Sequence, residues 1–232
     1  MKFEQNDIAL AFDEIYKNKG FNYLRPPDAY RIFVNLLSPT KGEKLLDVAC
    51  GPGILLKLMV EQGTLAYGVD VSREAIHMCR AYCPEANVLV GNAESLPFED
   101  ETFDYVSCIG SLERMINREK AISELKRVAR KGATFCIMVR NSNHFIWKLF
   151  MKPFKIYNKD AHQDAMNLNQ WSDLFNSCGL KILAVHPDHW PYYRLRQMIP
   201  LWNRNIDYFK VRKFPLGLDN AYEFIFMLEK NV

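Results

Sequence analysis

The stretch LLDVACGPGILL, residues 45–56, decides the fold. An apolar run containing an aspartate, Asp47, breaks into Cys-Gly-Pro-Gly and then becomes apolar again. Glycines between a strand and a helix allow a tight turn and let a ligand approach bare backbone. The stretch therefore predicts a buried strand over 44–50, a glycine turn, and a helix over 53–63.

This turn matches neither common phosphate-binding motif. The start of a helix offers free N–H groups that suit an anion. However, G-x-G-x-x-G would need a third glycine where Leu56 stands, and a P-loop would need Gly-Lys-Ser or Gly-Lys-Thr, which is absent. A nicotinamide-dependent dehydrogenase is disfavoured by Leu56, and for the loop taken alone a simple strand-to-helix turn stays an alternative.

Strands and helices alternate along the rest of the chain. Further strands are predicted over 65–71, 87–92, 103–109, 134–141, 180–186 and 221–230, and further helices over 73–83, 117–132 and 168–179. Near-continuous apolar strands between amphipathic helices are typical of a parallel sheet covered on both faces. Ligands of such sheets bind at the carboxyl ends of the strands, so we expect the functional site at that edge.

Composition excludes several classes of protein. The 232 residues are 49% hydrophobic and 25% charged, with a net charge of +3 that is too small to indicate a nucleic-acid-binding protein. No apolar run is long enough to cross a bilayer, and residues 1–20 do not form a signal peptide. The six cysteines include no C-x-x-C pair, which favours reduced cysteines in a cytoplasmic protein and no metal site.

Two polar positions at strand ends strengthen the case for a ligand site. Asp70 ends the second strand, about 20 residues after the glycine turn, where a carboxylate accepts hydrogen bonds from both hydroxyls of a ribose. Asn92 and Ala93 follow the third strand, which places a polar side chain beside a purine edge. A turn-forming aspartate is the simpler alternative for Asp70.

With these residues in place, the chain resembles the class I S-adenosylmethionine-dependent methyltransferases, and most closely their small-molecule branch. LLDVACGPG is similar to the glycine-rich first motif of that family, GVDVS to its ribose-binding motif, and GNAESLPFEDETFDYVSC to its adenine-binding segment. The resemblance implies a Rossmann-like, mostly parallel sheet of seven strands with the last strand antiparallel. It also implies one domain, comprising an N-terminal helical cap (1–43), a cofactor-binding core (44–141) and an acceptor-side half (142–232).

The resemblance also implies roles for individual residues. The cofactor would be S-adenosyl-L-methionine, with S-adenosyl-L-homocysteine as product. Asp47 would lie under its methionine end, Asp70 would hold the ribose, and Asn92, where the family usually has Asp, would face the adenine amine. The remaining cofactor-binding positions implied are Ala49, Gly51, Gly53, Val71, Ala93 and Ile109. A positively charged cofactor also explains a buried acid beside a turn that lacks a phosphate motif.

The resemblance fixes neither the acceptor nor a catalytic base. We expect methyl transfer to a small molecule, at oxygen or nitrogen, by in-line displacement; a catalytically silent cofactor-binding sensor or partner subunit is the alternative. Glu113 after the fourth strand and His144 after the fifth are the candidate catalytic residues. The aromatic and basic segment 187–220 separates the last two strands, and three readings of it stay open: a lid over the acceptor, a surface for peripheral membrane contact or a homodimer partner, or a packed helical elaboration.

Overall fold

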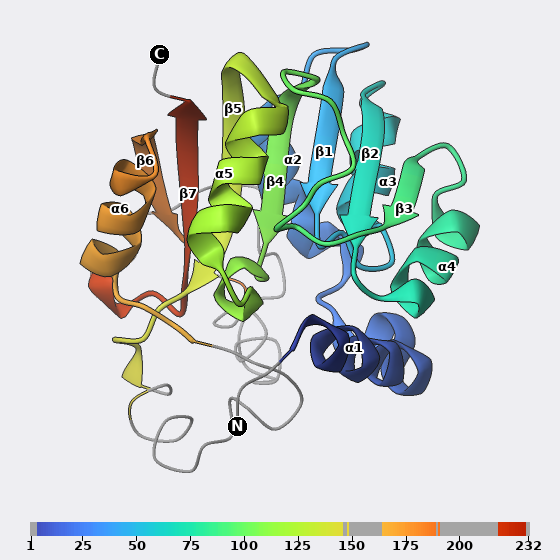
Figure 1. Ribbon diagram of the computed structural model, residues 1–232, viewed down its shortest axis with the longest axis horizontal. Helices are drawn as coiled ribbons and strands as arrows, with labels where there is room; N and C mark the ends of the chain where they lie inside the picture. The colour runs from blue at the N-terminus through green and yellow to red at the C-terminus, as the bar shows by residue number, and fades with distance from the viewer. Residues whose placement is uncertain (1–3, 146–147, 149–163, 189, 191–217, 231–232) are drawn as a thin grey trace, which may run out of the picture.

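The computed structural model describes residues 4–145, 148, 164–188, 190 and 218–230 (Figure 1). Its centre is a seven-stranded sheet in the order β3-β2-β1-β4-β5-β7-β6. The strands are β1 (Lys44–Val48), β2 (Leu65–Asp70), β3 (Asn87–Val90), β4 (Phe103–Ile109), β5 (Ala129–Arg140), β6 (Leu180–Pro187) and β7 (Glu223–Lys230). The sheet is mixed, which confirms the predicted Rossmann-like fold.

Strand direction decides which residues meet at the carboxyl edge. Strands β1 to β5 pair in parallel, whereas β7 runs antiparallel between β5 and β6. Because β7 is reversed, its first residue, Glu223, lies beside Arg140 at the end of β5. The predicted antiparallel last strand is therefore confirmed, and it delivers an acid to the edge where the parallel strands end.

Helices cover both faces of the sheet, as predicted (Figure 1). On one face, α2 (Arg31–Leu37), α3 (Ile54–Glu61) and α4 (Arg73–Tyr82) pack on alternate strand residues such as Leu45 and Cys136. On the other, α5 (Arg118–Val128) and α6 (Leu168–Ser177) pack on Leu46, Phe135 and Phe226. This alternation follows from the two-residue period of a strand.

One predicted boundary is wrong by several residues. The helical spacing predicted a helix to residue 132, but α5 ends at Val128 and β5 starts at Ala129. Ala129 pairs with Phe103 on β4, and the side chain of Lys230 donates a hydrogen bond to the carbonyl oxygen of Ala129. Pairing with the neighbouring strand therefore overrides the local helical pattern. The third and seventh strands are also shorter than predicted, ending at Val90 and starting at Glu223.

The N-terminal segment places helix α1 at the carboxyl edge of the sheet. It consists of α1 (Gln5–Lys19), two 3-10 turns, η1 (Gly20–Tyr23) and η2 (Pro27–Tyr30), and α2. Figure 1 shows α1 below the ends of β1 and β2 and beside α4. Its Asp13 accepts hydrogen bonds from the Ser72 hydroxyl (2.6 Å) and the Glu74 N–H (3.0 Å) at the start of α4. Among the described helices, none has both the length and the apolar character needed to span a membrane.

Candidate active site

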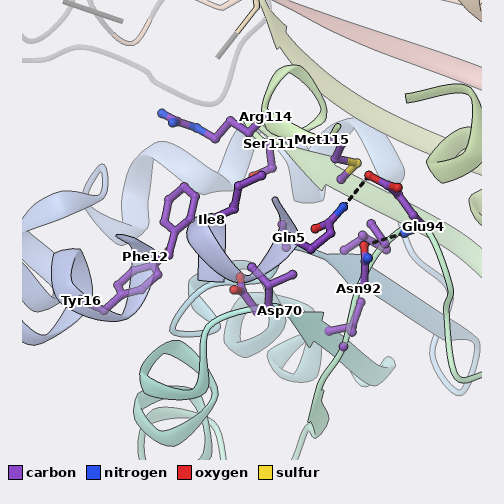
Figure 2. A pocket seen from close by; sticks show the side chains of 16 residues that line it. Gln5, Ile8, Phe12, Tyr16, Asp70, Asn92, Glu94, Ser111, Arg114 and Met115 are labelled. Carbon is purple, nitrogen blue, oxygen red and sulfur yellow. Dashed lines mark hydrogen bonds between the residues drawn. The ribbon is translucent and has the colours of Figure 1, made fainter. Parts of the chain in front are cut away.

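Two adjoining cavities open at the carboxyl edge of the sheet. The first is lined by the ends of β1 and β2, by the turn after β3, and by α1; Figure 2 shows its side chains. The second lies beyond the β1 turn and reaches the ends of β4 and β5. Both cavities are lined by Phe12, Tyr16, Ala49, Ser111 and Arg114. One elongated ligand can therefore occupy both cavities.

The turn after β1 presents bare backbone to the second cavity. Ala49 and Gly51 have φ angles of 58° and 54°, in the left-handed region that favours glycine. A Cβ atom added at Gly51 would stand 2.8 Å from the Tyr16 hydroxyl oxygen. The sequence therefore needs glycine at this position both for the backbone conformation and for the close approach of Tyr16.

Asp70 ends β2 in the first cavity. Its carboxylate accepts hydrogen bonds from the backbone N–H groups of Gly51 (2.8 Å) and Ser72 (2.9 Å). Burial raises the pKa of Asp70 to about 6, against the opposing effect of these N–H groups. The side chain is therefore ionised at neutral pH and fixed in orientation, with lone pairs left for a ligand. Val71 lies next to it in the cavity wall.

Asp47 lines the second cavity as a buried carboxyl group with one polar partner. The hydroxyl of Ser107, on β4, donates a hydrogen bond to its Oδ1 atom (2.7 Å). Burial raises the pKa of Asp47 to about 7, partly offset by that hydrogen bond and increased by the charge of Asp70. Among the described residues no cation pairs with Asp47. A ligand cation would therefore remove the unfavourable burial of its charge.

The turn after β3 supplies the polar end of the first cavity. The Oδ1 atom of Asn92 accepts a hydrogen bond from the Glu94 N–H (2.9 Å), as drawn in Figure 2. Gln5 of α1 donates to the Glu94 carboxylate (2.7 Å). Ala93 lies in the same wall. The turn that carries Asn92 is therefore held by its own backbone and by α1.

Helix α1 closes the first cavity with Gln5, Ile8, Phe12 and Tyr16, none of which belongs to the sequence motifs quoted above (Figure 2). These residues recur every three or four positions and so share one face of a helix. This helical spacing was the signal in the sequence that could have identified them as one face of a helix. The hydrogen bond that the Ser72 hydroxyl donates to Asp13 ties α1 to the start of α4 and so keeps this face over the cavity.

The second cavity carries a group of buried ions that join segments far apart in the chain. Arg25 pairs with Asp188 (3.0 Å) and Glu223 (2.9 Å), and Arg140 pairs with Glu223 (3.1 Å). The side chains of Arg25 and Glu223 are 9% and 5% exposed. Arg25, Arg140 and Glu223 line the cavity, and sequence reasoning missed all three. Arg140 and Glu223 are polar residues at a strand end and a strand start, which was the only signal in the sequence.

The candidate bases and Gly53 lie elsewhere. Glu113 is buried, neither of its carboxylate oxygens has a hydrogen-bond partner among the residues that the structure describes, and burial raises its pKa. His144 is buried against Tyr222, and burial lowers its pKa. Neither is among the residues that line the two cavities. Gly53, which starts α3 with φ of 84°, packs against Cys79 rather than facing a cavity, whereas Ile109 lines the second cavity.

Gly51 gives a direct test of the turn. We expect Gly51→Ala to weaken the binding of S-adenosylhomocysteine by about tenfold, because its Cβ displaces Tyr16 and strains the turn. Gly42→Ala is the matched control: φ is 86° there, and an added Cβ meets nothing within 4 Å. It should lose about 1 kcal/mol of stability without affecting affinity. Equal affinity losses in both variants, measured by calorimetry, would contradict the role of Gly51.

These residues fit S-adenosylmethionine and do not fit a pyrophosphate. Asp47 is a buried carboxyl group that has no cation beside it in the described part of the chain, Asp70 is a fixed carboxylate, and Asn92 belongs to a polar turn. The turn after β1 carries an acid where a phosphate site would need a cation. The arrangement matches a cofactor with a neutral, hydroxyl-bearing end and a positively charged end.

Comparison with known proteins agrees with this geometry. Residues 46–137 match the family described as methyltransferase domain. An uncharacterised methyltransferase of Synechocystis is 27% identical over 154 residues, covering 65% of this chain and 72% of the relative. The demethylmenaquinone methyltransferase of Bacillus licheniformis is 25% identical over 210 residues, covering 76% and 89%. A solved structure of the Haloferax volcanii Trm112 methyltransferase activator in complex with a putative methyltransferase also has a similar fold. The similarity covers 100% of this chain and 100% of the matched chain, with a TM-score of 0.68 and 18% sequence identity.

The order of motifs, the strand order and these matches together identify the family. The match covers the glycine turn, the acid at the end of β2 and the segment after β3, which line the two cavities together with α1. The family match over residues 46–137, taken with the order of the strands, identifies a class I S-adenosylmethionine-dependent methyltransferase domain whose cofactor is S-adenosylmethionine.

Proposed function

We propose that the chain transfers the methyl group of S-adenosylmethionine to an oxygen or nitrogen atom of a small molecule bound in the second cavity. The observation that carries this proposal is the junction of the two cavities at Ala49 and Ser111. It gives the cofactor one cavity for its adenosine end and leaves room in the other for its methionine end and an acceptor.

In this arrangement the first cavity binds adenosine. Asp70 accepts hydrogen bonds from the ribose hydroxyls, and Val71 packs on the adenine ring. Asn92 accepts from the adenine amine through the second lone pair of Oδ1, the first being used by Glu94. Ala93 offers its backbone N–H to a ring nitrogen. The residues of α1 close the cavity against water.

The methionine end lies against the turn after β1. Asp47 pairs with the ammonium group, and Gly51 and Ile109 line this part of the second cavity. When bound, S-adenosylmethionine supplies a methyl carbon activated by a positively charged sulfur. The chain contributes alignment, since it holds donor and acceptor in one enclosed space, and such positioning lowers the barrier of an in-line displacement.

The proposal extends to the compartment and the parts of the chain. All six cysteines are free, which supports the cytoplasm as its compartment. The division into a cap (1–43), a core (44–141) and an acceptor-side half (142–232) is supported by the residues that each part contributes to the cavities. The segment 187–220, proposed as a lid, a membrane contact or a homodimer surface, falls almost entirely outside the described residues.

The main alternative is a protein that binds the cofactor without turnover. It is favoured by one observation: neither Glu113 nor His144 lines a cavity. Two measurements distinguish a methyltransferase from a protein that binds the cofactor without turnover. Calorimetry should show tight binding of S-adenosylhomocysteine and no binding of NAD, and a panel of small phenols, acids and amines should yield S-adenosylhomocysteine from S-adenosylmethionine. Binding without turnover on the whole panel would favour the sensor, and NAD binding alone would overturn the cofactor assignment.

A further inference from the structure

Arg114 stands at the junction of the two cavities. It ends η3 (Leu112–Arg114), the 3-10 turn after β4, and lines both cavities. Its guanidinium carbon lies 5.4 Å from the ring centroid of Phe12, and its Nη2 atom is 3.5 Å from the Tyr23 hydroxyl. Figure 2 shows the side chain extending past Phe12. An aromatic ring and a long hydrogen bond therefore hold Arg114 in place without neutralising its charge.

The charges around the second cavity are unevenly matched. Arg25 and Arg140 are paired with Asp188 and Glu223. Arg114, in contrast, forms no ion pair with any carboxylate in the part of the chain that the structure describes. The lining carboxylates are Asp47, which the proposed function assigns to the cofactor, and Glu223, which two arginines already hold. Of the three arginines that line this cavity, Arg114 is therefore the one without an ion-pair partner among the described residues.

The neutral groups of the cavity point to the same kind of ligand. The hydroxyl groups of Tyr16, Tyr23 and Tyr30 belong to its lining residues. Burial raises the pKa of Tyr30 to about 12 and raises that of Tyr16 well above its usual range, so both remain hydrogen-bond donors at neutral pH. A cavity with donors and an unpaired guanidinium suits an acceptor that presents oxygen. With Asp47 on the cofactor and Glu223 held by two arginines, a protonated amine would find no free carboxylate among the residues that line this cavity.

We propose that the acceptor binds as an oxyanion, a phenolate or a carboxylate, and that Arg114 is the residue that selects it. This inference rests on the proposed function, because it takes the positively charged sulfur to lie near the junction. A guanidinium and a sulfonium on the same side of a cavity repel each other, and an anion between them relieves that repulsion. Arg114 therefore lowers the pKa of an acceptor phenol and fixes its oxygen near the methyl group.

This charge arrangement also explains the absence of a base from the cavity lining described here. The acceptor releases its proton to solvent when it binds as an oxyanion. An oxygen lone pair then forms the O–CH₃ bond while the C–S bond breaks and leaves its electron pair on sulfur. The negative charge of oxygen and the positive charge of sulfur cancel, so no proton remains to be removed in the transfer step. Glu113 and His144 need no part in this chemistry.

The test uses 4-nitrophenol, whose phenolate absorbs visible light, with the protein saturated with S-adenosylhomocysteine. We expect the bound probe to ionise about one pH unit lower than the free probe. Arg114→Gln should abolish that shift and weaken phenolate binding about tenfold, whereas Arg114→Lys should retain part of both. Arg73→Gln is the matched control, because it removes an equal charge from the exposed start of α4. It should change neither the pKa shift of the probe nor its affinity. Benzoate, competing with the probe, reports whether a carboxylate is also accepted.

Four outcomes would overturn the proposal while leaving the cofactor assignment intact. The probe's pKa in Arg114→Gln could match that in wild type, or 4-nitrobenzylamine could bind more tightly than 4-nitrophenol. The wild-type complex could bind neither 4-nitrophenolate nor benzoate. Finally, Arg114→Gln could weaken S-adenosylhomocysteine but not 5′-methylthioadenosine, which would assign Arg114 to the carboxylate of the cofactor. A wild-type protein that fails to bind S-adenosylhomocysteine would instead refute the proposed function itself.

Discussion

Replacing Asp70 with alanine should weaken the binding of S-adenosylhomocysteine by about 100-fold. Each charge-assisted hydrogen bond from the carboxylate to a ribose hydroxyl contributes about 1.5 kcal/mol or more, and every 1.4 kcal/mol is about tenfold in affinity. The carboxylate is ionised at neutral pH and is fixed by the N–H groups of Gly51 and Ser72. Its removal therefore deletes both ribose contacts at once.

The same change also loosens the turn after β1, because Asp70 holds the Gly51 N–H. Comparing adenosine with 2′,3′-dideoxyadenosine separates the two effects. The wild-type protein should prefer adenosine, and Asp70→Ala should lose that preference. Asp70→Asn keeps one acceptor oxygen, so its preference for adenosine should lie between those of the wild-type protein and Asp70→Ala. If Asp70→Ala still preferred adenosine to 2′,3′-dideoxyadenosine as strongly as the wild-type protein does, the assignment of Asp70 to the ribose would be wrong.

Asp47 should make cofactor binding strongly dependent on pH. Its pKa is about 7, so it is ionised above that pH and, in the proposed binding mode, attracts the ammonium group of the cofactor. Below pH 7 it is protonated, and affinity should fall by about tenfold per pH unit, on the order of 100-fold at pH 5. Asp70, with a pKa of about 6, adds to the loss at the acidic end of this range.

Asp47→Asn is the matched control because it keeps the acceptor for Ser107 and removes only the titration. Its affinity at pH 8 should be lower than that of wild type and nearly constant down to pH 7. Without cofactor, the folded-state pKa of Asp47 exceeds its value in the unfolded chain, so the free energy of unfolding falls as pH rises toward 7. Asp47→Asn should therefore be the more stable protein at pH 8. Identical pH profiles of binding for the two proteins would exclude Asp47 as the partner of the cation.

The location of the cavity residues proposed for the cofactor could be predicted because these residues lie at strand ends that are near one another in sequence. Asp47, Asp70 and Asn92 each follow or end a buried strand, and parallel strands bring such ends to one edge. All three line the cavities. The position of a residue at a strand end was therefore enough, without knowledge of its contacts.

The acceptor half could not be predicted in this way. Arg25 and Glu223 are 198 residues apart, and only the antiparallel direction of β7 brings Glu223 to the carboxyl edge. Arg114 adjoins Glu113, and the sequence gives no sign that the arginine, not the acid, faces the cavities. The prediction of a helix to residue 132 is wrong for a related reason, because the strand pairing at Ala129 is a contact between segments that are distant in sequence.

Transfer of a labelled methyl group tests the central claim most directly. The purified protein is incubated with S-adenosylmethionine that carries a trideuterated methyl group and with the small molecules of a cell extract, and the products are analysed by mass spectrometry. The account predicts one product that gains a trideuteromethyl group at oxygen in place of a proton, formed in equal amount with S-adenosylhomocysteine. Saturation with the labelled cofactor, with neither labelled product nor S-adenosylhomocysteine formed, would contradict it.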